Sequence, residues 1–173
     1  MSNHPPRAGR TLAVPCQLLV PAADLLEYSP IVMEQTFHYY YLDWISKGKW
    51  LGTTLVKRKN LTSPQDLRNR RNVLPRVVDG GRHFSYMGGV DKIIKKMTAI
   101  VDGNEIVVNS NKNLTDREHI KECMRTGKDL YGRKNIHESQ FYPYDISKIN
   151  LPYLNEFVKK YPYFLRKYDF AED

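Results

Sequence analysis

Cysteine is scarce in this 173-residue chain, which contains only Cys16 and Cys123. Two cysteines so far apart form neither a disulfide framework nor a metal knuckle, so we expect reduced thiols and a cytoplasmic setting. The chain also lacks any apolar run of about 18 residues or more, and no transmembrane helix is predicted. Pro15, Gln17 and Pro21 interrupt the first apolar stretch, which makes it a poor signal peptide.

Several motifs of well-known enzyme classes are absent. The chain has no Gly-x-Ser-x-Gly elbow, no glycine-rich phosphate loop ending in Lys-Ser/Thr and no His-Glu-x-x-His pair. Hydrolase, nucleotidase and zinc-protease functions are therefore unsupported. An Asp-x-Asp pair, which would hold a divalent cation against a diphosphate, is missing as well. No residue is assigned as a metal ligand.

The excess positive charge is confined to one segment. The net charge is +8, and residues 47–76 contain nine basic side chains against one acid, Asp66. Outside this segment 18 basic and 18 acidic residues cancel. Such a basic face is suited to nucleic acid, an anionic membrane or the diphosphate of an activated substrate, or it is simply a solvated surface.

The sequence pattern of the first half of the chain predicts two strands followed by a short helix. Residues 1–27 are rich in Pro and Ala without a clear period, and we expect a poorly structured leader. The β-branched and aromatic run at 31–44 predicts a strand, and a second strand is expected at 50–57, after a Lys-Gly-Lys turn. A short helix should follow, with Ser63 as N-cap and Pro64 at its first position.

The second half alternates helices with one strand. Apolar spacing over 90–101 predicts an amphipathic helix, and a strand is expected at 105–109. Thr115 and Glu118 form a capping box before a helix that Gly127 ends. A last helix is predicted over 152–160. This alternation indicates an α/β fold with a mixed sheet and flanking helices.

The stretch GGRHFSYMGG at 80–89 has two glycine pairs, which mark positive φ or close approach of another group. Strand alternation between the pairs places His83 and Ser85 on one face, with Phe84 and Tyr86 on the other. One interpretation is a buried strand closed by two turns. The other is the edge of a pocket.

The pocket-edge interpretation assigns chemistry to this stretch. Backbone N–H groups at Gly88 and Gly89, before a helix, would lie where a phosphate or sugar could bind. His83 is a candidate acid or base near neutral pH, and Ser85 a candidate for orienting the substrate. We therefore predict His83 and Ser85 as catalytic residues.

Several segments in order resemble a known family. HFSYMGG, a Lys-rich helix ending KKMTAIV, a Glu, and then EHIKECMRTGKDLYGR resemble the C-terminal half of glycosyltransferase family 17. This family includes the beta-1,4-mannosyl-glycoprotein N-acetylglucosaminyltransferase that adds bisecting GlcNAc. Its Gly-x-Asp-x-x-x-Arg segment here reads Gly127, Asp129 and Arg133. FHYYYLDW, WLGTT and DLRNRR are similar to its middle region, so the resemblance covers about residues 25–168.

The chain departs from the family pattern in three places. Arg82 replaces the usual Trp, Asp102 stands near the position of a His, and no Asp-x-Asp-Glu stretch precedes the aromatic strand. We therefore expect a member truncated at its N-terminus, in which a leader at 1–27 precedes a family domain at 28–173. Either the remaining half still transfers sugar, or the activity is lost with the missing half.

The resemblance implies part of a GT-A-like transferase that moves a sugar, such as N-acetylglucosamine, from a nucleotide-sugar to a glycan acceptor. It also implies Mn²⁺ or Mg²⁺ as cofactor. Such an enzyme must bind the donor, neutralise its leaving diphosphate and deprotonate an acceptor hydroxyl. The predicted substrate-binding residues include aromatics for sugar stacking, the glycine pair, basic side chains and the family's Asp/Arg pair: Trp50, Tyr86, Gly88, Gly89, Arg71, Asp129 and Arg133.

Two other functions remain open. A nucleic-acid-binding module would use the basic segment 47–76 with Tyr39, Tyr40 and Trp50 as stacking groups, although nucleic acid is the less favoured partner. A non-catalytic remnant would fold without transferring sugar. Donor sugar, acceptor, linkage and oligomeric state are not determined by the sequence.

Overall fold

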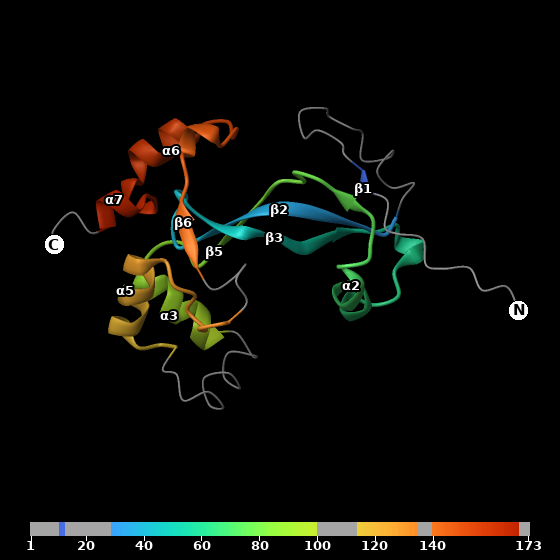
Figure 1. The fold of residues 1–173 in the computed structure, drawn as a ribbon, viewed down its shortest axis with the longest axis horizontal. Coiled ribbons are helices and arrows are strands. Elements are labelled where there is room, and N and C mark those ends of the chain that lie inside the picture. Colours follow the sequence, from blue (N-terminus) through green and yellow to red (C-terminus); the bar gives the residue numbers. More distant parts are fainter. Residues whose placement is uncertain (1–10, 13–28, 100–113, 135–139, 170–173) are drawn as a thin grey trace, which may run out of the picture. The chain divides into compact units, whose positions relative to one another are not determined.

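A computed structural model describes residues 11–12, 29–99, 114–134 and 140–169 (Figure 1). The chain divides into two compact units. The first unit comprises Met1–Thr36 and Lys49–His83, and the second comprises Phe37–Gly48 and Phe84–Asp173. Thr11 and Leu12, inside the predicted leader, form a short strand. The strand predicted at 105–109 lies outside the described residues.

The described strands form one mixed sheet in the order β1-β4-β2-β3-β6, with β5 also paired to β2. Their bounds are β1 Thr11–Leu12, β2 Ile31–Tyr39, β3 Trp44–Leu55, β4 Arg76–Val77, β5 Arg82–Ser85 and β6 Phe141–Pro143. β4 is parallel to β1 and β2, whereas β6 is antiparallel to β3. A mixed sheet accompanied by helices agrees with the predicted α/β class.

The predicted boundary between the first two long strands is wrong. β2 ends at Tyr39, a turn follows, and β3 continues through the Lys-Gly-Lys sequence without a break. Tyr40 takes a left-handed φ of 65° in this turn, and the Trp44 N–H donates to the Tyr41 carbonyl at 3.3 Å. The turn contains neither Gly nor Pro, and Asp43 is its one residue of a turn-forming type, so the sequence signal for it was weak. Gly48 instead lies within β3 and donates to Ser46 Oγ at 3.0 Å.

The first unit contains the predicted short helix, α2, at Pro64–Arg70. Ser63 is its N-cap as predicted, because its Oγ accepts from the Asp66 N–H at 3.0 Å. A single turn of 3₁₀ helix, η2 at Arg58–Asn60, precedes α2. Leu67 is buried and holds the helix in the unit.

The first glycine pair of the 80–89 stretch has two separate uses. Gly81 has a φ of 115°, a conformation that favours glycine, and its carbonyl accepts from the Thr36 N–H at 3.0 Å. A Cβ on Gly80 would lie 3.0 Å from the Met33 Cβ and from the Val77 carbonyl oxygen. Positive φ and close approach, both predicted for these glycines, are therefore confirmed.

Two helices of the second unit follow the predicted pattern. α3 at Val90–Ala99 buries Ile93 and Met97, and α5 at Arg117–Thr126 buries Ile120, Cys123 and Met124. Gly127 ends α5 with a φ of 73°, as predicted. The predicted capping box is wrong by one residue. The N-cap is Asp116, whose Oδ1 accepts from the His119 N–H at 2.7 Å, because a carboxylate is a strong acceptor at this position.

The end of the second unit is a series of short helices. They are η3 Ile146–Lys148, α6 Leu154–Lys160, η4 Pro162–Phe164 and α7 Arg166–Asp169. The helix predicted from Pro152 begins at Leu154, because Tyr153 takes a left-handed φ of 60° and serves as its N-cap. The helix ends before Pro162, as expected. α7 was not predicted.

Candidate functional site

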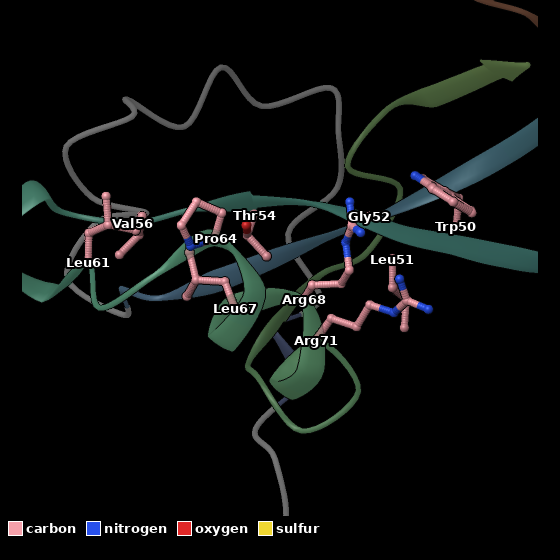
Figure 2. Close-up of a pocket in the computed structure, with 10 residues that line it drawn as sticks. All are labelled: Trp50, Leu51, Gly52, Thr54, Val56, Leu61, Pro64, Leu67, Arg68 and Arg71. Atoms are coloured by element: carbon pink, nitrogen blue, oxygen red, sulfur yellow. The ribbon is translucent and has the colours of Figure 1, made fainter. Parts of the chain in front are cut away.

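A pocket of about 530 Å³ lies in the first unit, where α2 faces β3 (Figure 2). Its wall combines apolar residues, an indole and two arginines. The lining residues are Trp50, Leu51, Gly52, Thr54, Val56, Leu61, Pro64, Leu67, Arg68 and Arg71. Two of the predicted substrate-binding residues, Trp50 and Arg71, therefore line the same pocket.

Local geometry explains why these side chains meet. Leu67 and Arg71 are four residues apart, and Arg68 and Arg71 are three apart, so helical spacing places them on neighbouring faces of one turn. Trp50 and Gly52 are alternate residues of β3 and share one face of the strand. Figure 2 shows both arginine side chains extending from α2 toward β3. The sequence analysis singled out Arg71 and counted Arg68 only as part of the basic segment 47–76.

Trp50 is held in place by a ring stack and a glycine. Its indole lies parallel to the His83 imidazole, with ring centroids 4.3 Å apart and an interplanar angle of 12°. A Cβ on Gly52 would lie 2.2 Å from the Trp50 Nε1, so the indole occupies the space that any larger residue would need. His83, a predicted catalytic residue, therefore contacts the pocket through Trp50.

The described part of the first unit is strongly basic. It contains nine basic and three acidic side chains. Each acid is ion-paired: Glu34 with Arg76 at 3.6 Å, Asp66 with Arg70 at 3.2 Å and Asp79 with Lys49 at 3.8 Å. Within the part of the chain that the structure describes, no acid pairs with the two pocket arginines. Their charge is therefore available to an anionic ligand.

Ser85, the other predicted catalytic residue, belongs to the second unit and has different neighbours. Only 7% of its surface is exposed, and its Oγ accepts from Lys96 Nζ at 3.2 Å. Burial lowers the pKa of Lys96, whose Nζ also lies 4.1 Å from the centre of the Tyr86 ring. The sequence analysis assigned no role to this lysine.

The predicted strand does not extend to Tyr86. β5 ends at Ser85, and Tyr86 takes a left-handed φ of 56°. Its ring is 8% exposed, lies 4.9 Å from the Tyr39 ring and is covered by Lys96, while its hydroxyl hydrogen-bonds that of Tyr131. Burial raises the pKa of Tyr86. Little ring surface remains for a sugar.

The second glycine pair forms the turn before α3. Gly88 and Gly89 have φ values of 94° and 85°, which confirms the predicted positive φ. The Gly89 carbonyl accepts from the Ile93 N–H at 3.1 Å, so the helix starts directly after the pair. A Cβ on Gly89 would meet no atom within 4 Å. The predicted ligand contact at these N–H groups stays a prediction.

Asp129 and Arg133 form an internal ion pair. Arg133 donates from Nε and Nη2 to the two carboxylate oxygens, at 3.0 and 2.6 Å, and its backbone N–H donates to the same group at 2.9 Å. The Asp129 side chain is fully buried. Its acceptor sites are therefore used within the unit, and the geometry favours a structural role over the substrate contact implied by the resemblance.

Metal-ligating and thiol chemistry have little support in the residues that are described. Among residues 11–12, 29–99, 114–134 and 140–169, no three His, Cys, Asp or Glu side chains are grouped to hold a metal ion. Burial raises the pKa of the Cys123 thiol to about 11, so this buried cysteine is a poor nucleophile near neutral pH. None of the described helices is long and apolar enough to cross a membrane.

Fold and site together define an α/β protein with a basic pocket bordered by an aromatic stack. Comparisons with protein-family models, curated proteins and solved structures find no match to this chain. The functional conclusion therefore rests on the residues and their geometry.

Proposed function

We propose that this chain is a glycosyltransferase-like protein whose first-unit pocket binds the diphosphate of a nucleotide-sugar donor. The observation that carries the proposal is the placement of Arg68 and Arg71 in a pocket that also contains Trp50, without an acidic partner among the described residues. Arginine is suited to phosphate oxygens because its planar guanidinium donates several hydrogen bonds in a fixed geometry.

The size and lining of the pocket support a ligand with both charged and apolar parts. Small-molecule sites commonly have volumes of about 300–1,000 Å³, and this pocket has about 530 Å³. The arginines would contact the diphosphate, and Trp50 would stack on a sugar or base ring. Leu61 and Pro64 supply apolar surface for the remainder of the nucleotide.

The proposed chemistry assigns separate tasks to these groups. An acceptor hydroxyl attacks the anomeric carbon of the donor sugar. The bond between that carbon and the diphosphate oxygen breaks, and negative charge develops on the leaving oxygen. Arg68 and Arg71 stabilise that charge. His83, held against Trp50, accepts the proton of the attacking hydroxyl. Ser85 has no part in this pocket and stays a separate prediction.

Donor binding tests the proposal directly. UDP-N-acetylglucosamine is titrated into the full chain by calorimetry, and into Arg68→Gln, Arg71→Gln and the control Lys59→Gln. Lys59 is an exposed base of the same unit that does not line the pocket. We expect each arginine variant to weaken binding roughly 10- to 100-fold, because a hydrogen bond to a charged group contributes about 1.5–3 kcal/mol. The control should bind like the parent chain.

The outcomes separate the proposal from its competitors. Equal losses in all three variants would indicate diffuse charge attraction, and absence of donor binding would refute the donor site. If the donor binds, His83→Ala should abolish sugar transfer to a glycan acceptor while leaving donor affinity within about threefold. A parent chain that binds donor and transfers no sugar would be the non-catalytic remnant.

The nucleic-acid alternative loses two of its three stacking groups. Tyr39 and Tyr40 are each 1% exposed, so neither ring can stack on a base. Trp50 remains half-buried. An RNA titration over increasing salt completes the comparison, because affinity based on phosphate contacts should fall steeply with salt.

A further inference from the structure

Large apolar side chains are exposed along the last helices of the second unit. Tyr153 is 80% exposed, Phe157 39% and Tyr163 48%. We call these three residues the α6 aromatic stripe. A soluble domain normally covers most of its large aromatic surface, so exposure of three such rings within eleven residues indicates an interaction surface.

Backbone geometry aligns the stripe. The Phe157 N–H donates to the Tyr153 carbonyl and the Tyr161 N–H donates to the Phe157 carbonyl, each at 2.9 Å. This i,i+4 spacing places Phe157 and the flanking Tyr153 and Tyr161 near one side of α6, whereas Tyr163 follows in η4. Phe157 lies 5.1 Å from the Tyr161 ring, and Tyr161 lies 6.2 Å from Tyr163, so the rings form a continuous series.

Basic side chains accompany the stripe. Residues 145–169 contain five basic and three acidic residues. Lys159 and Lys160 are exposed on α6, and neither forms an ion pair among the described residues. Lys160 Nζ lies 5.3 Å from the centre of the Tyr161 ring, so charge and aromatic surface adjoin. A partner that fits this surface must be both anionic and able to receive aromatic rings.

We propose that the α6 aromatic stripe with Lys159 and Lys160 binds the surface of a membrane that contains anionic phospholipid. Tyrosine and phenylalanine are stable at the level of the headgroups, and lysines beside them attract the negative surface. A second copy of the chain fits less well, because symmetric pairing of this face would bring its lysines toward those of the partner. The proposal is independent of the donor pocket.

Vesicle flotation with the full chain tests the proposal. Vesicles of phosphatidylcholine alone are compared with vesicles that also contain phosphatidylserine. We expect binding to the anionic vesicles, and a loss of roughly 25-fold in Lys159→Gln/Lys160→Gln, because each basic residue near the surface contributes about fivefold. The control, Lys92→Gln/Lys95→Gln, removes the same charge from exposed positions of α3 and should retain binding.

A second variant tests the aromatic part at constant charge. Tyr153→Ser/Phe157→Ser should weaken binding to anionic vesicles at least tenfold, and its circular dichroism spectrum should match that of the parent chain because both rings are exposed. Three results would overturn the proposal: no binding to anionic vesicles, equal losses in both lysine pairs, or undiminished binding without the aromatics. Concentration-dependent sedimentation that the serine variant abolishes, without vesicle binding, would instead identify a contact between copies of the chain.

Discussion

Arginine has opposite surroundings in the two units. In the second unit, Arg133 donates three hydrogen bonds to the fully buried carboxylate of Asp129. In the first unit, Arg68 and Arg71 line a pocket and have no acidic partner among the described residues. An arginine that is hydrogen-bonded to a buried carboxylate therefore has a structural role. An arginine without such a partner is a candidate ligand contact.

The aromatic residues differ in the same way. Tyr39 and Phe141 stack in the second unit with ring centroids 4.2 Å apart, and both are 1% exposed. Trp50 and His83 stack equally closely in the first unit, but both are only half-buried. The first pair is therefore part of the hydrophobic core, whereas the second pair has exposed surface that a ligand can reach. Four substitutions test how far this contrast holds.

The largest effect is expected from Gly127→Ala in the second unit. A Cβ at this position would lie 1.7 Å from the Trp44 Cζ3, inside the core, and the residue has a φ of 73°. Overpacking and left-handed strain together should lower the free energy of unfolding by about 3–5 kcal/mol. Urea unfolding measures the change, and a loss below about 1 kcal/mol would show that the core around Trp44 yields easily.

A smaller effect is expected from Asp129→Asn. The amide keeps the size of the side chain and removes its charge, so the paired Arg133 loses its charge-assisted hydrogen bonds. We expect the free energy of unfolding to fall by about 2–3 kcal/mol. Arg71→Gln, which removes a charge without an acidic partner, should change it by less than about 0.5 kcal/mol. Similar losses in both variants would contradict the contrast between the two units.

A stability effect nearly as small as that of Arg71→Gln is expected from Gly52→Ala in the first unit. The three atoms nearest to the new Cβ all belong to the half-buried Trp50 indole, which can rotate toward solvent. The free energy of unfolding should therefore change by less than about 1 kcal/mol. The stack on His83 should be lost, and with it the near-ultraviolet circular dichroism of that indole. Donor affinity should also fall, because loss of the stack leaves Trp50 misplaced in the pocket. An unchanged spectrum would mean that the pocket accommodates the methyl group.

Local signals in the sequence predicted part of this structure. Ser63 as an N-cap, Gly127 as a helix end and the positive φ of Gly88 and Gly89 depend on neighbouring residues only, and all are confirmed. The turn after Tyr39 was missed because its tyrosines favour strands and only Asp43 favours a turn, so the position of the turn depends on the pairing of the long strands. Local propensity alone cannot show where two strands pair.

The candidate site was predicted residue by residue but not as an arrangement. Trp50 and Arg71 were identified, and the structure places both in one pocket, yet Arg68 and the stack with His83 depend on contacts between distant segments. Ser85 was predicted as catalytic and Tyr86 as substrate-binding, and the structure buries both. Exposure is a property of the folded chain, and the alternation of a short strand does not reveal it.

The sequence by itself determined the charge distribution, the N-cap of α2, the end of α5 at Gly127 and the positive φ of the second glycine pair, because these depend on composition and on residues a few positions apart. Tertiary structure alone decided which arginines keep their charge available. Arg133 meets a buried carboxylate four residues earlier, and Arg68 and Arg71 meet an open pocket. That distinction follows from burial, since an ion pair is held strongly only where water is excluded, and burial exists only once the chain has folded.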